Sequence, residues 1–203
     1  MRLPILITVL ILIVVIGFAV RRGKDQYARD EADFWEKERR ANSTRRKSLD
    51  GLKLISVPLD RLPTDVCTDD PRIAEYVEIV TGLAETRIAN LTGISNTDLK
   101  LQYGAPNITE LSKYDQRYTA LASTLQRWAD ALLEKGERDA AQVILEYAVE
   151  IGTDVSGTYR ALAKLYDEAG DKDSIRALIP KAEALNTPMK DSILHALNER
   201  LTC

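Results

Sequence analysis

The chain has few of the residues from which catalytic and metal sites are built. Its 203 residues include one histidine, His195, and two cysteines, Cys67 and Cys203. The cysteines form no CxxC pair and no ligand cluster, so the sequence indicates neither a disulfide framework nor a zinc site, and both a single bridge and two free thiols fit it. There is no phosphate loop, nucleophile elbow or hydrolase triad. We therefore expect no catalytic activity, cofactor or metal ion, and we interpret the lone His195, set among leucines, as structural.

No strong excess of one charge is present either, but the net charge of −3 hides a division. Residues 21–48 contain ten Lys/Arg and six Asp/Glu, and residues 49–203 contain seventeen Lys/Arg against twenty-five Asp/Glu. Phosphate backbones are bound by basic surfaces. The acidic balance of the larger part therefore argues against nucleic acid as a partner, and no small-molecule substrate is evident.

The N-terminal segment is the one long apolar run. Residues 3–20 contain no charged residue, and as a helix they would span about 27 Å, close to the thickness of a hydrocarbon core. A cleaved signal peptide, with Gly17–Ala19 as its site, and a buried core helix are the alternatives. Because Arg21 and Arg22 follow the run directly, we predict an uncleaved anchor at 1–24 that contacts membrane lipid through residues 3–20.

The charges beside this run predict its orientation. Four basic residues follow it within nine positions, whereas only Arg2 precedes it. The positive-inside rule then predicts a single-pass protein whose larger part is cytoplasmic. Three Asn-x-Thr/Ser sequons, at Asn42, Asn90 and Asn107, would instead suit an extracytoplasmic domain.

Residues 25–48 form a predicted juxtamembrane charged helix or linker. Tyr27, Phe34 and Trp35 are candidates for an aromatic belt at the lipid headgroups. The alternative is a solvated spacer of mixed charge.

Residues 49–106 are predicted to combine extended pieces with one helix. Asp70 and Pro71 begin the helix as its cap and first residue, and apolar residues at helical spacing continue it to about residue 92. Two short runs, one around Leu52–Val57 and one at Leu99–Tyr103, favour either a minor two-stranded sheet or two extended connectors.

Residues 107–203 read as helices with an internal period. Asn107 and Glu110 predict a capping box for a helix that continues to Lys135. Seven identities then recur 34 residues apart. They are Thr124/Thr158, Ala129/Ala163, Glu134/Glu168, Gly136/Gly170, Asp139/Asp173, Ala148/Ala182 and Thr153/Thr187. Each window reads as helix, tight turn, helix.

This period resembles the tetratricopeptide repeat (TPR), with repeats at about 122–155 and 156–189 and a capping helix at 191–201. Small residues occur where the family's paired helices touch, and a large apolar residue, Trp128 or Leu162, precedes the first of them in each repeat. The family's terminal proline is replaced by Thr153 and Thr187, and Pro180 lies inside the last helix of the second repeat. The resemblance implies an all-α fold: an N-terminal transmembrane helix and a TPR-like α-α superhelix of two repeats with flanking helices.

The resemblance also implies a groove that binds another protein or peptide. Carried onto this chain, the groove positions of the family are Gln126, Asp130, Leu133, Glu134, Arg160, Lys164, Asp167 and Glu168. The alternative is that these residues form only a solvated face. We therefore expect a membrane-anchored adaptor or scaffold, or alternatively a structural or assembly subunit of a membrane complex whose contacts are made through the transmembrane and juxtamembrane segments.

Overall fold

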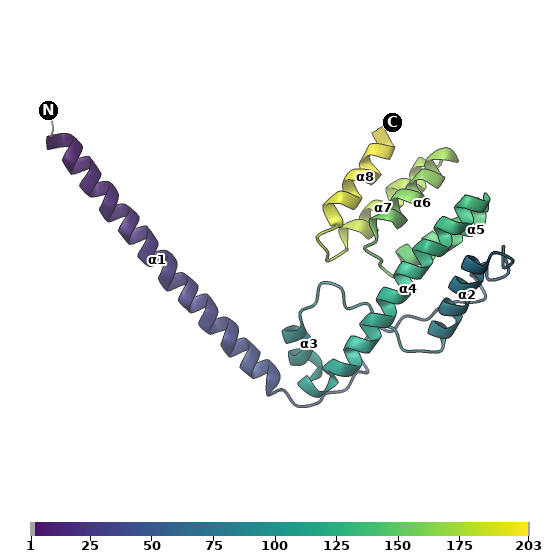
Figure 1. Cartoon of the computed structure of the whole chain (residues 1–203), viewed down its shortest axis with the longest axis horizontal. Coiled ribbons are helices and arrows are strands. Elements are labelled where there is room, and N and C mark those ends of the chain that lie inside the picture. Colours follow the sequence, from purple (N-terminus) through teal and green to yellow (C-terminus); the bar gives the residue numbers. More distant parts are fainter. Residues whose placement is uncertain (1–2, 203) are drawn as a thin grey trace. The chain divides into compact units, whose positions relative to one another are not determined.

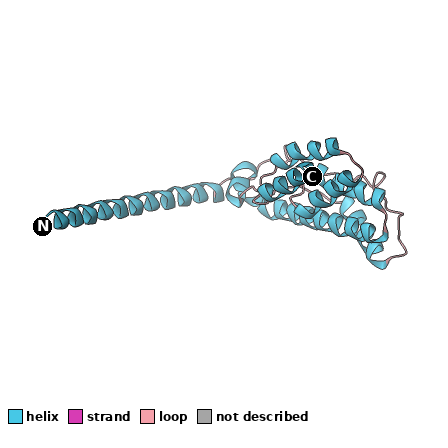
Figure 2. Ribbon diagram, turned by 90° about the horizontal axis from the view of Figure 1, so that it is seen from above, coloured by secondary structure: helices cyan, strands magenta, loops and turns pink. Residues whose placement is uncertain are grey.

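The computed structural model describes residues 3–202, apart from the side chains of residues 3–11, 13–15, 19 and 25. All regular elements in this part of the chain are helices (Figure 2), as the sequence predicts. The contacts between residues divide the chain into two compact units. The first consists of Met1–Lys47 and Ser95–Ile108, and the second of Ser48–Ile94 and Thr109–Cys203.

The first unit consists of α1 (Leu3–Asn42), α3 (Asn96–Tyr103) and the short 3-10 helix η1 (Ala105–Asn107). The chain begins α3 after Ser95, whose side chain accepts a hydrogen bond from the amide of Asp98. Lys100 then joins α3 to the end of α1, since its Nζ donates to the carboxylate of Glu38 and, at 2.7 Å, to Oδ1 of Asn42. The expected extended piece at Leu99–Tyr103 was therefore wrong, because these residues are helical.

The second unit begins with an extended segment and α2 (Pro71–Ala84). Asp70 caps α2 as predicted, accepting from the amide of Arg72 at 2.9 Å. The helix ends at Ala84 and not near residue 92, because Ile88 is used in an extended contact: the amide of Ile55 donates to its carbonyl at 2.9 Å. A two-stranded sheet was one of the two predicted alternatives for this region. The described residues contain this isolated antiparallel bridge instead.

The helix α4 covers Ile108–Lys135, as the periodicity predicts. The expected capping box at its start was wrong. The side-chain amide of Asn107 is buried and donates to the carbonyls of Lys47 and Tyr103, each at 2.8 Å, so it ties η1 to the end of α3. An amide held in this way is not presented for glycosylation.

The predicted membrane span at 3–20 lies mostly outside the residues whose side chains the structure describes. In the part that is described, no helix has both the length and the apolar character needed to cross a bilayer. The backbone of α1 continues through this region as one helix to Asn42 (Figure 1). A Cys67–Cys203 bridge would involve Cys203, which also lies outside the described residues.

Two helical hairpins follow, formed by α4 with α5 (Arg138–Glu150) and by α6 (Ser156–Glu168) with α7 (Lys172–Glu183). Their turns at Gly136 and Gly170 have positive φ values of 85° and 74°. In both turns the glycine amide donates a hydrogen bond to the carbonyl three residues earlier. The amide of the next residue donates to the carbonyl five residues before it. These are the two hydrogen bonds of a Schellman helix end. The 34-residue period thus gives the same turn twice.

Small side chains lie where the helices pack. Ala129, Ala148, Ala163 and Ala182 are fully buried, as are the large residues Trp128 and Leu162 that precede the first of them in each hairpin. The last helix, α8 (Lys190–Thr202), packs against both α6 and α7 and buries Ile193 and Leu197. Pro180 lies within α7 without ending it.

The glycine turns lead to a prediction about stability. We expect Gly136→Ala to destabilise the protein by about 1 kcal/mol, because a positive φ strains any residue with a Cβ while nothing lies within 4 Å of that atom. Gly82→Ala, inside α2 and equally open, should instead stabilise it by about 0.5–1 kcal/mol. Urea unfolding followed by circular dichroism measures both changes. Stability changes of the same sign in the two variants would contradict the positive-φ turn at Gly136.

Candidate functional site

The eight residues predicted to line a partner groove lie on α4 and α6, the first helices of the two hairpins. We call this surface the α4/α6 face. The structure joins its two halves directly: the hydroxyl of Thr158 donates to Oε1 of Gln126 at 2.6 Å, and Nε2 of Gln126 donates to Asp130 at 2.8 Å. Asp130, Glu134, Arg160, Lys164 and Glu168 are exposed, and Gln126, Leu133 and Asp167 are half-buried.

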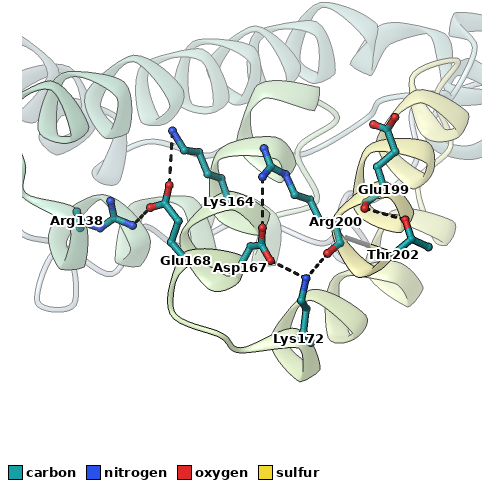
Figure 3. A network of polar contacts seen from close by, with 8 residues as sticks. All are labelled: Arg138, Lys164, Asp167, Glu168, Lys172, Glu199, Arg200 and Thr202. Carbon is teal, nitrogen blue, oxygen red and sulfur yellow. Dashed lines mark hydrogen bonds and ion pairs between the residues drawn. The ribbon is translucent and has the colours of Figure 1, made fainter.

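Glu168 is held between two cations (Figure 3). It accepts a hydrogen bond from Arg138 of α5, and its other oxygen lies 3.8 Å from the ammonium nitrogen of Lys164. The hydrogen bond from Arg138, more than any other contact, keeps the pKa of Glu168 below its ordinary value. This carboxylate is therefore ionised and already paired within the molecule.

Asp167 links α6 to the two helices that follow (Figure 3). It accepts from Nζ of Lys172 at 2.7 Å and from Nη1 of Arg200 at 3.4 Å. Lys172 also donates to the main-chain carbonyl of Arg200 at 2.6 Å. The contact with Lys172 lowers the pKa of Asp167. Because these bonds hold α6, α7 and α8 together, we assign Asp167 a structural role.

Glu134, at the α4 end of the face, is paired with the second residue of α2. Nη1 of Arg72 lies 3.1 Å from its carboxylate, and the same guanidinium bonds Asp70. Lys135 also reaches Asp70, at 3.0 Å. A hydrogen bond from the side chain of Arg72 is the largest cause that holds the pKa of Asp70 well below its usual range, and one from Lys135 is the second largest. The acidic end of the face therefore fastens α2 to α4.

Both positive charges of the α4/α6 face are incompletely neutralised, whereas three of its four carboxylates are paired with cations and only Asp130 is not, within the described residues. Arg160 donates only to the hydroxyl of Ser156, at 2.8 Å, and has no carboxylate partner within the described part of the chain. Lys164 shares Glu168 with Arg138, and its side chain is 61% exposed. A carboxylate of a partner could therefore pair with Arg160 and Lys164 without displacing a strong internal contact.

A second feature was not predicted from the sequence. A cleft of about 780 Å³ lies where α5 and α7 end, and its other wall is formed by the extended segment 53–56 and by residues 90 and 92. Among its polar lining residues are Lys53, Asp154 and Lys181. Its size is typical of ligand sites.

The remaining chemistry of the described residues is sparse. No group of three or more His, Cys, Asp and Glu side chains in this part of the chain is arranged to bind a metal ion. His195 is exposed on α8, with Nδ1 3.6 Å from a carboxylate oxygen of Glu199.

No family model, curated protein or solved structure matches the chain. The TPR resemblance therefore depends on the 34-residue period itself.

Proposed function

We propose that the protein is a membrane-anchored interaction module of TPR type, an adaptor or scaffold without catalytic activity. The observation that carries this proposal is the pair of exposed cations on the α4/α6 face, Arg160 and Lys164, beside Asp167 and Glu168, which are already paired. Repeat domains use such a face to hold a helix or an extended segment of another protein. The charges favour a partner segment with carboxylates.

The proposed anchor rests on the sequence of residues 3–20, which contains no charge. The basic residues that follow favour a cytoplasmic location for the hairpins. Because α1 is continuous to Asn42, the anchor and its extension would form one helical stalk.

The test is partner capture by crosslinking in native membranes. We expect Arg160→Glu combined with Lys164→Glu to reduce capture at least tenfold, because two attractive contacts become repulsive. The matched control reverses Lys113 and Arg176, which are exposed on α4 and α7 outside the face. Capture that survives the first pair of changes, with circular dichroism showing an intact fold, would refute the proposal.

One observation favours the alternative function, a structural or assembly subunit that makes its contacts through α1. Phe34 and Trp35 are more than half exposed and meet edge to face with ring centroids 5.3 Å apart. Along a continuous helix Phe34 lies about 21 Å beyond residue 20, whereas the headgroup layer is only about 5–8 Å deep. The pair therefore suits a protein contact better than an aromatic belt. Replacing Phe34 and Trp35 by alanine should abolish capture under this alternative alone.

A further inference from the structure

The extended segment 53–56 forms one wall of the cleft at the ends of α5 and α7, and one edge of this segment forms no main-chain ladder in the described residues. Ile55 bonds Ile88 through its main chain. In an extended chain the N–H and C=O of one residue point to one side, and those of the next residue point to the other. The N–H and C=O groups of Leu54 and Ser56 therefore point away from Ile88. Tyr147, which lines the cleft, confirms this direction, because its hydroxyl donates to the carbonyl of Ser56 at 3.1 Å.

The main-chain groups on this edge are available to a ligand. Within the described residues, no main-chain hydrogen bond is made by either group of Leu54 or by the amide of Ser56. Leu54 is 48% exposed and lines the cleft. A peptide in extended conformation could therefore pair with this edge, as in recognition by strand addition.

One carboxylate that lines the cleft, Asp154, favours a cation. Asp154 is half-buried, and its carboxylate accepts a hydrogen bond from the hydroxyl of Thr187 at 2.9 Å but has no cationic partner in the part of the chain that is described. The carboxyl ends of α5 and α7 add partial negative charge at the same place. Lys53 and Lys181 also line the cleft, but both are exposed and their long side chains can turn toward solvent.

We infer that this cleft binds an extended peptide segment of a partner protein, which pairs with the edge at Leu54–Ser56 and places a lysine or arginine side chain against Asp154. This goes beyond the proposed function, because the cleft and the α4/α6 face share no residue. One partner could occupy both surfaces, with its carboxylates on the face and its basic side chain in the cleft.

The test measures binding of short labelled peptides to the full-length chain in neutral detergent micelles, followed by fluorescence anisotropy. The probe is a heptapeptide of alternating valine and lysine, and its counterpart contains glutamate in place of lysine. We expect the lysine peptide to bind more tightly. Asp154→Asn keeps an acceptor for Thr187 but removes the charge, and should weaken binding about tenfold. Lys181→Glu should tighten it, since a repulsive charge becomes attractive.

Three controls make the result specific. Asp173→Asn, on the exposed start of α7, should leave binding unchanged. Methylating alternate main-chain nitrogens of the lysine peptide should weaken binding about tenfold, because the strand pairing loses its donors. Reversing Arg160 and Lys164 should leave it unchanged, which separates this inference from the proposed function. Tighter binding of the glutamate peptide, no binding of either peptide, full binding by Asp154→Asn, or insensitivity to methylation would each overturn the inference.

Discussion

Replacing Trp128 with alanine should lower the free energy of unfolding by about 3–5 kcal/mol. Trp128 is a fully buried residue of α4 and belongs to the main apolar core of the second unit. Truncation would leave a cavity in a close-packed interior that relaxes only in part. Because small domains are stable by about 5–15 kcal/mol, this one change would remove a large share of the total. Urea unfolding at 25 °C, followed by circular dichroism, measures it.

Two further variants separate packing from other causes. In Trp128→Phe the ring refills much of the space, and the indole N–H, which has no hydrogen-bond partner in the described residues, no longer has to be buried. We therefore expect this variant to lose less than half as much stability as the alanine variant. Trp35→Ala, on the exposed part of α1, should change stability by less than about 0.5 kcal/mol. An alanine variant of Trp128 within 1 kcal/mol of the original chain would show that this core is wrongly assigned.

The hairpins were predictable because their signals are local. A glycine ends α4 and α6, and the apolar residues between the turns recur at helical spacing. Each signal acts within one or two turns of helix, so tertiary contacts did not have to be known. The same holds for the cap at Asp70 and for α8.

Two predictions failed because burial alone does not distinguish a helix from an extended chain. Ile88 and Leu91 are buried and lie at helical spacing after α2, yet they are buried in an extended segment against Ile55 and neighbouring helices. At Leu99–Tyr103 the alternating pattern favoured an extended piece, but Ser95 and Asp98 form a helix cap there. That Ser-x-x-Asp spacing was the local signal that could have predicted α3.

The two candidate surfaces also differ in how far local sequence signals predict them. The α4/α6 face could be located from the repeat because its residues recur with the period. Which charges are available there could not be predicted, since the partners of Glu134 and Asp167 include Arg72 and Arg200 from distant parts of the sequence. The cleft brings together four separate segments between residues 53 and 187, and no local pattern predicts that arrangement.

Replacing Gly104 with alanine should release α3 from the end of α1. Gly104 ends α3 with φ 93° and ψ 140°, a region that residues with a Cβ hardly occupy. A Cβ at this position would also fall on the main chain of Arg45. That segment cannot easily move, because Thr44 accepts from Ala105 at 3.1 Å and Lys47 donates to Tyr103 at 3.0 Å.

Either the left-handed turn or these bonds must therefore break in Gly104→Ala. We expect hydrogen-exchange protection of the α3 amides to fall at least tenfold, while the amides of α5 to α7, in the other compact unit, keep theirs. Gly51→Ala is the matched control, since nothing lies within 4 Å of its added Cβ. Unchanged protection in α3 would mean that the chain can relieve the clash at Arg45 without loss, and the docking of α3 through this segment would then be wrong.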